Sequence, residues 1–169
     1  AAQFTAADNM TQQIAALGSL LRIGRGQDAL EAFYQQWESE RLVVDKWFAI
    51  QIACAAPEAA VNVAQKLTEH RDFSIKNPNR FRSVFRPLAS NFAAFHHRSG
   101  DGYKMMTDWI IKLDRINPQL AARSCGVFET LGQFDAQRKS MICTNLRRIL
   151  DSPELSRDTT EMATRMLKA

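Results

Sequence analysis

The chain has 169 residues, 46% of them hydrophobic and 24% charged, which is an ordinary composition for one globular domain. A net charge of +4 is too small and too dispersed to indicate nucleic-acid binding. The chain has no run of 18 apolar residues, and its first residues lack a basic start and an apolar stretch, so neither a membrane span nor a signal peptide is predicted.

Apolar residues recur at steps of three and four along most of the chain, and strand-like alternation is hardly seen. One stripe differs from the others, because residues 43–54 are apolar almost all round the helix, which predicts an interior position. Gly24 and Gly26 close the first stripe. The predicted helices cover residues 10–21, 30–37, 43–54, 59–67, 77–86, 103–113, 120–131, 142–149 and 155–166.

Prolines mark several of the predicted helix starts. Asn77-Pro78, Asn117-Pro118 and Ser152-Pro153 each offer a capping side chain followed by a proline that suits the first helical position. Pro57 is placed to enter the first turn of the helix over 59–67. Pro87 is expected to interrupt the helix that opens at Asn77, because the residue before a proline avoids the helical region.

These patterns predict an all-α fold. The connections are short, and no repeat with matching residues recurs at a fixed period, so we expect an irregular superhelix or solenoid-like array of antiparallel helix pairs, with about eight to ten helices. Cys54, Cys125 and Cys143 lie in apolar helical patterns without C-x-x-C spacing, so we expect buried free thiols in a reducing compartment.

The sequence contains no recognisable catalytic centre. His96 and His97 are adjacent, so on a helix they point about 100° apart and cannot share a metal from one face, and His70 lies far from both. There is no His-Glu-x-x-His motif, no Gly-x-Ser-x-Gly nucleophile and no glycine-rich phosphate loop. Taken alone, this segment is predicted to be no enzyme.

One segment is unusual in charge, because residues 71–98 contain six basic residues and only one acidic residue, Asp72. Arg82 and Arg86 are four apart and would share a helix face. The segment could be a solvated basic face or a cationic lining that meets an anionic group of a ligand. The basic residues are Arg71, Lys76, Arg80, Arg82, Arg86 and Arg98.

Six short motifs resemble, in order and spacing, the C-terminal helical domain of bacterial aminopeptidase N, a family of zinc alanyl aminopeptidases. The resemblance runs over roughly residues 8–168. The motifs are Val44-Asp45-Lys46-Trp47-Phe48, His70-Arg71 with Phe73, Asn77-Pro78-Asn79-Arg80-Phe81-Arg82-Ser83, Ala94-Phe95-His96 with Asp101-Gly102-Tyr103, Asn117-Pro118-Gln119-Leu120-Ala121-Ala122-Arg123, and Phe134-Asp135-Ala136-Gln137-Arg138.

The resemblance implies a division of labour within a longer enzyme. The zinc and the catalytic motifs of that family lie in an earlier domain, so this segment would contain no catalytic residue and bind no metal or cofactor. Residues 8–169 would form one capping domain that gates peptide access, and residues 1–7 would connect it to what precedes. The resemblance also implies that Arg82, Gln119 and Arg123 line the downstream part of the substrate cavity.

The expected partners are the catalytic and other domains of the same polypeptide and peptide substrates, in a bacterial cytoplasm, without nucleic acid or membrane. One alternative is a free-standing helical module that binds an acidic peptide along its basic face. Another is an RNA-binding helical protein that uses residues 71–98, where core packing already explains Phe73, Phe81 and Phe85. This chain departs from the family pattern around Arg86-Pro87, which leaves open the directions in which the side chains of Arg82 and Arg86 point.

Overall fold

The computed structural model describes residues 2–168, and every regular element in that part of the chain is helical, which confirms the all-α prediction. Nine of its α-helices have seven or more residues, and two have four. The α-helices are α1 (Ala2–Thr5), α2 (Met10–Arg22), α3 (Gln27–Trp37), α4 (Arg41–Ala53), α5 (Ala60–Thr68), α6 (Pro78–Ser90), α7 (Phe92–Phe95), α8 (Asp101–Asp114), α9 (Pro118–Ser124), α10 (Ala136–Leu150) and α11 (Arg157–Leu167), with two 3-10 turns, η1 (Cys125–Phe128) and η2 (Leu131–Gln133).

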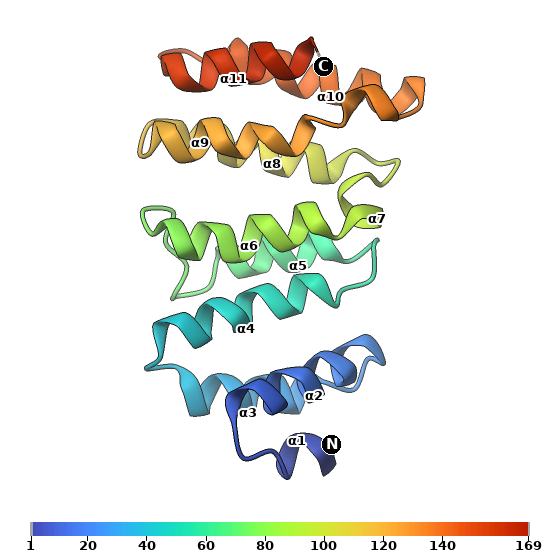
Figure 1. Ribbon diagram of the computed structural model, residues 1–169, viewed down its shortest axis with the longest axis vertical. Helices are drawn as coiled ribbons and strands as arrows, with labels where there is room; N and C mark the ends of the chain where they lie inside the picture. Colours follow the sequence, from blue (N-terminus) through green and yellow to red (C-terminus); the bar gives the residue numbers. More distant parts are fainter. Residues whose placement is uncertain (1, 169) are drawn as a thin grey trace. The chain divides into compact units, whose positions relative to one another are not determined.

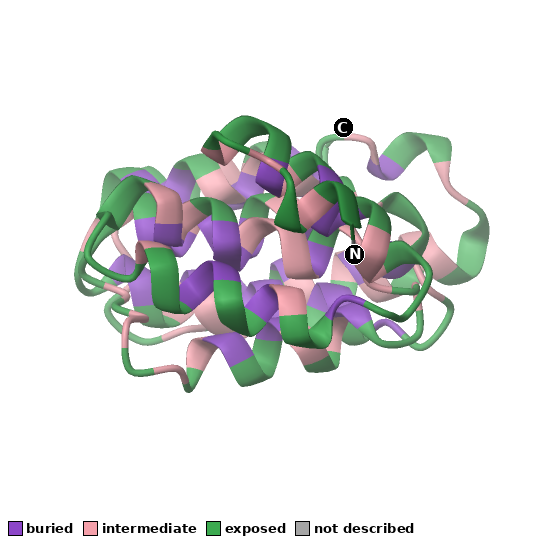
Figure 2. Cartoon of the chain, turned by 90° about the horizontal axis from the view of Figure 1, so that it is seen from below, coloured by how far each residue is buried: buried purple, intermediate pink, exposed green. Residues whose placement is uncertain are grey.

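The chain divides into two compact units. Unit 1 comprises Ala1–Ser74 with Asn79–Ala94, and unit 2 comprises Ile75–Pro78 with Phe95–Ala169. Within each unit the chain doubles back at short connections, so that successive helices lie against one another (Figure 1). The helices carry buried bands on their packed faces and exposed residues on their outer faces, as amphipathic sequences require (Figure 2).

Helix α4 is the centre of unit 1, where it packs against α2, α3 and α5. Its residues Val44, Trp47, Phe48 and Ile52 are buried, which confirms the interior position predicted for 43–54. The indole of Trp47 donates a hydrogen bond to the carbonyl oxygen of Leu30 at 3.0 Å, so the one polar atom of this large side chain is satisfied inside the core.

Unit 2 is built on α8, which packs against α9 and α10, while α11 packs against α9 and α10. Tyr103, Phe95 and Phe128 are buried in contact with one another. A side chain at Gly102 would place its Cβ 2.7 Å from the carbonyl oxygen of Phe95. Glycine is therefore required at this position for α8 to approach the preceding segment.

A buried carboxylate joins the end of α8 to the start of α11. Asp114 is 3% exposed, and its Oδ2 accepts from the backbone N–H of Ser156 at 2.8 Å, while its Oδ1 accepts from the hydroxyls of Ser156 and Thr159, each at 2.5 Å. Because the donors sit in the first turn of α11, this contact satisfies groups that a helix leaves without internal partners. The sequence patterns did not single out Asp114.

The predicted interruption at Pro87 is wrong, because α6 continues through this proline to Ser90. Pro87 lies near the end of the helix, so its missing N–H costs one intrahelical hydrogen bond, and its own carbonyl still accepts from Asn91 N–H at 2.8 Å. Burial of Phe85 and Leu88 on either side of the proline stabilises the helical path across it.

The proline-based helix starts are confirmed at two of four places. Helix α6 begins at Pro78, and α9 begins at Pro118 with the Asn117 side chain accepting from Leu120 N–H at 3.0 Å. Helix α11 is capped by Ser156 and not by Ser152, because Glu154 takes a left-handed φ of 61° that ends any helix started at Pro153.

Two further details differ from expectation. Pro57 lies in a turn three residues before α5 and not in its first turn. All three thiols are free, but only Cys125 is buried, where burial raises its pKa to about 12. Cys54 and Cys143 are half-buried, since they lie at the edge of the packed face of their helices.

Candidate functional site

Helix α6 has two chemically different faces. Its buried face carries four apolar side chains, Phe81, Val84, Phe85 and Leu88, together with Arg80 and Ser83. With about 100° between successive helical residues, Asn79, Arg82 and Arg86 fall together on the opposite side. Arg82 is half-buried and Arg86 is exposed. Arg80 therefore faces the core, and Arg82 and Arg86 lie together on the outer side of the helix.

Arg80 is part of the core of unit 1. It is 5% exposed, its Nε donates to Asp45 Oδ1 at 2.6 Å, and its Nη1 donates to the carbonyl oxygen of Asp72 at 3.0 Å. The centre of its guanidinium lies 4.6 Å from the centroid of the Phe48 ring. These contacts leave Arg80 no part in binding a ligand.

Arg71 is also engaged within unit 1. Its Nε donates to the Tyr34 hydroxyl at 3.0 Å and its Nη2 to Glu38 at 2.6 Å, while the Tyr34 hydroxyl donates to Asp72 Oδ2 at 2.6 Å. Burial, followed by the bond to Asp72, raises the pKa of Tyr34 above its usual value. Two of the six basic residues predicted as a common face are therefore structural, because acids far away in sequence pair with them.

Arg82 and Arg86 remain available for a ligand. The Nη1 atom of Arg82 donates a long hydrogen bond of 3.5 Å to Asn79 Oδ1, which orients the side chain without neutralising it. Within residues 2–168, neither guanidinium lies within ion-pair distance of a carboxylate. The outer face of α6 therefore presents two uncompensated positive charges one helical turn apart.

Gln119 and Arg123 belong to unit 2 and lie on α9. Both are exposed, on the side of the helix opposite to Leu120, Ala121 and Ala122, which are buried. Their four-residue spacing puts an amide and a guanidinium on one face, as predicted. No carboxylate of the described chain pairs with Arg123. The structure thus forms two separate candidate groups, Arg82 with Arg86 in unit 1 and Gln119 with Arg123 in unit 2.

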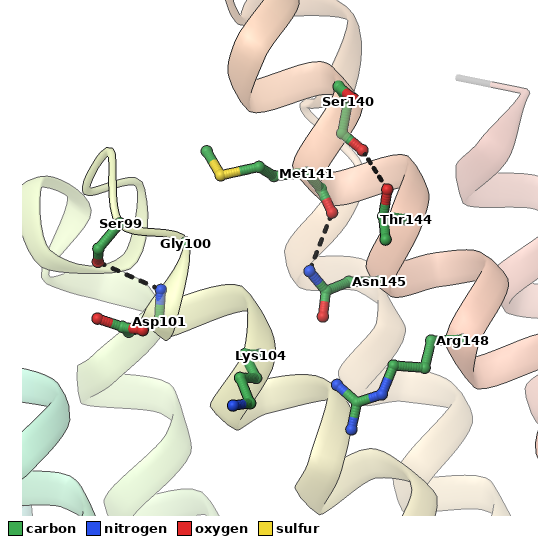
Figure 3. Close-up of a pocket in the computed structure, with 9 residues that line it drawn as sticks. All are labelled: Ser99, Gly100, Asp101, Lys104, Ser140, Met141, Thr144, Asn145 and Arg148. Carbon is green, nitrogen blue, oxygen red and sulfur yellow. Dashed lines mark hydrogen bonds between the residues drawn. The ribbon is translucent and has the colours of Figure 1, made fainter.

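Unit 2 also contains a pocket of about 320 Å³ between the start of α8 and the helix α10 (Figure 3). Two of its polar side chains donate hydrogen bonds to backbone carbonyl oxygens one turn earlier in α10. The hydroxyl of Thr144 donates to Ser140 O at 2.9 Å, and the amide of Asn145 donates to Met141 O at 2.9 Å. Arg148 is paired with Asp108. The pocket therefore offers a ligand mainly the ammonium group of Lys104 and the carboxylate of Asp101.

Burial lowers the pKa of two of the three histidines, His70 and His96. His96 is buried, and its Nδ1 lies 2.8 Å from the Tyr103 hydroxyl. Burial, reinforced by the charge of Arg138, lowers the pKa of His96 to about 4, and burial raises that of Tyr103 to about 12, so both partners of this hydrogen bond are neutral near pH 7. His97 contacts Ser99 at 3.1 Å, and burial lowers the pKa of His70 in unit 1.

Residues 2–168 contain no group of three or more His, Cys, Asp and Glu side chains placed to hold a metal ion. A zinc site needs three or four such donors around one point, and the histidines of this chain do not meet that requirement. The described helices are all too short or too polar to cross a lipid bilayer.

A family of helical-repeat domains matches residues 1–168; its description is a domain of unknown function, DUF3458_C, with ARM repeats. The chain belongs to this family. ARM repeats are stacked helices, so the description agrees with the solenoid-like array predicted from the sequence. The DUF3458_C chain shows this architecture without matching residues at a fixed period, which is why the sequence did not indicate the repeat itself.

The DUF3458_C chain is similar to one segment of much longer bacterial enzymes. It is 38% identical over 165 residues to the aminopeptidase N of Haemophilus influenzae, 39% over 170 to that of Caulobacter vibrioides and 36% over 168 to that of Escherichia coli. These alignments cover 96%, 97% and 98% of this chain and 19% of each relative. The chain thus spans about a fifth of the length of the curated relatives it matches.

A solved structure shows the same fold. The crystal structure of Legionella pneumophila aminopeptidase A in complex with aspartic acid matches with a TM-score of 0.93 and 33% identity, covering 99% of this chain and 20% of that one. The resemblance to aminopeptidase N that the short motifs indicated is confirmed by these relatives.

Proposed function

We propose that this DUF3458_C domain is the C-terminal capping part of a zinc-dependent aminopeptidase N, an enzyme that removes N-terminal residues from peptides. The observation that carries the proposal is that nearly the whole chain matches about a fifth of three bacterial aminopeptidases N. The histidines of the chain do not fit a zinc site, so the metal and the hydrolytic residues belong to another part of the longer polypeptide.

The role of this domain is to orient the peptide and to keep bulk water from the site. Arg82, Gln119 and Arg123 line the cavity on the downstream side of the bond that is cleaved. Their donors suit this task, since a guanidinium can bind a peptide carbonyl or carboxylate through two parallel N–H groups and an amide can both donate and accept. Holding the substrate in a productive position lowers the barrier without any group of this domain touching the reacting atoms.

The remaining parts of the proposal concern organisation and location. Residues 8–169 act as the cap, and residues 1–7 connect it to the preceding part of the polypeptide, whose other domains are its partners. The enzyme acts on peptides in the bacterial cytoplasm. Bacterial relatives and three free thiols support this placement, since thiols persist in a reducing compartment.

The experiment compares two substrates in the complete enzyme. Arg123→Ala should lower kcat/KM for a peptide of four or more residues about tenfold, the loss expected for one charge-assisted hydrogen bond, and leave that for an alanyl anilide within about twofold. Arg147→Ala, which removes an exposed arginine of α10 in the same unit, is the matched control. Equal losses on peptide and anilide, or no loss on either, would overturn the assignment of Arg123.

A further inference from the structure

The outer face of α6 carries positive charge and no negative charge. The helix carries Arg80, Arg82 and Arg86 and no acidic residue. Within residues 2–168 six arginines pair with a carboxylate, and Arg82 and Arg86 are not among them. The six are Arg71, Arg80, Arg138, Arg148, Arg157 and Arg165. Two like charges one turn apart destabilise a helix by a few tenths of a kcal/mol, a cost that nothing in the fold of unit 1 offsets.

The pair is held on a rigid element. Phe81, Val84, Phe85 and Leu88 anchor the opposite face of α6, and the helix continues through Pro87, so Arg86 stands on the helix and not on a loop. Residues four apart are separated by about 6 Å along the axis. Two guanidinium groups at that spacing can both reach one carboxylate, and the contact of Arg82 with Asn79 is weak enough to yield to a charged ligand.

We propose that Arg86 acts together with Arg82 as a specificity-determining pair that binds a carboxylate on the peptide downstream of the cleaved bond. This inference rests on the proposed function, because it needs α6 to face the substrate. A peptide offers such a group either as an acidic side chain or as its C-terminal carboxylate. Both present the same two oxygens to the arginines, so the substrates of the test must separate them.

The test uses the complete enzyme and four matched peptides with the same N-terminal alanine. Two are amidated and differ only by Glu or Gln at one downstream position, and two differ only by a free or amidated C-terminus. The wild type should favour the charged member of at least one pair about fivefold to tenfold in kcat/KM, the range expected for one charge-assisted contact. Salt should reduce this preference, because an exposed pair is screened.

Arg86→Ala should abolish most of the preference, and Arg86→Glu should abolish it altogether, because the new carboxylate would pair with Arg82 one helical turn away. Alanine is a strong helix former and Arg86 is exposed, so both variants should fold, which circular dichroism checks. The control is Arg25→Ala, which removes an exposed arginine from the turn after α2 in the same unit and should leave the preference unchanged.

The outcomes separate this inference from the proposed function. If Arg123→Ala alters peptide kinetics while Arg86→Ala leaves both charge preferences intact, the arginine pair is refuted and the capping role stands. The absence of any charge preference in the wild type also refutes the pair. If the complete enzyme cleaves no peptide at all, both proposals fall together.

Discussion

Arg80 and Arg82 stand two residues apart on α6 and play opposite parts. Arg80 points into unit 1, pairs with Asp45 and covers Phe48, whereas Arg82 points away from the core and, among residues 2–168, hydrogen-bonds to the amide oxygen of Asn79. The charges are identical, so the helical period alone decides which one stabilises the fold and which one can bind a ligand. A count of basic residues in a segment therefore overstates the surface available to a partner.

The largest expected effect lies on the core-facing side. Arg80→Ala would leave the Asp45 carboxylate, whose side chain is 16% exposed, without its guanidinium partner, and breaking a buried pair typically costs about 3–5 kcal/mol. The free energy of unfolding from a urea titration measures the loss. The double variant Arg80→Met with Asp45→Leu removes both charges and should recover most of the stability. A loss in the double variant as large as in the single one would contradict the ion-pair explanation.

Unit 2 offers a comparable buried charge. Asp114→Ala removes the acceptor of three hydrogen bonds from Ser156 and Thr159, so we expect a loss of about 2–4 kcal/mol in the free energy of unfolding. The control is Asp151→Ala, which removes an exposed carboxylate from the end of α10. Unchanged helicity and stability in Asp114→Ala would show that α11 does not depend on this contact.

A smaller effect should appear on acidification. The folded state holds the pKa of His96 near 4, while an unfolded histidine titrates near 6.5. At a pH between these two values, the histidine is protonated in the unfolded state and neutral in the folded state. Stability is therefore fully present above pH 6.5 and falls as the pH decreases toward 4. Between pH 7 and pH 5 the loss should be about 1–2 kcal/mol.

The measurement for His96 is the urea midpoint at pH 7 and pH 5. In His96→Gln, whose amide can still hydrogen-bond to the Tyr103 hydroxyl, the difference between the two midpoints should shrink. It should not vanish, because burial also lowers the pKa of His70 in unit 1. A pH dependence identical to that of the wild type would rule out His96 as its source.

The smallest effect on stability belongs to the outer side of α6. Arg82→Ala and Arg86→Ala remove no buried contact, and they relieve repulsion between like charges, so the free energy of unfolding should change by less than about 0.5 kcal/mol in either direction. The urea titration used for Arg80 serves here too. A loss above about 1 kcal/mol in either variant would mean that these arginines belong to the core after all.

Most helices could be predicted from the sequence, since their apolar stripes repeat with the helical period, and α4 was recognised as a buried helix. The single helix predicted over 120–131 is wrong, because α9 ends at Ser124 and the 3-10 turns η1 and η2 follow it. Several other errors came from prolines. Pro87 lies inside α6 because packing of Phe85 and Leu88 outweighs one lost hydrogen bond, and Ser152 is not a cap because Glu154 turns the chain away first. Local rules cannot weigh such contributions against tertiary contacts.

The candidate site was only partly predictable. The shared face of Gln119 and Arg123 follows from their spacing, but the pairing of Arg80 with Asp45, 35 residues earlier, required the fold. A signal was present, since Asp45 is a lone acid within an apolar stretch and a buried acid needs a cation. Asp114, just before the helix start at Asn117-Pro118, carried no comparable signal.

In the proposed function, the outer face of α6 binds the substrate, and its inner face packs in the core of unit 1. The variant Arg82→Ala in the complete enzyme tests this division most directly. The measurement is kcat/KM for a peptide relative to that for an alanyl anilide, at unchanged unfolding midpoint. We expect the ratio to fall about tenfold, as for the loss of one charge-assisted hydrogen bond. A ratio equal to that of the wild type would contradict the account.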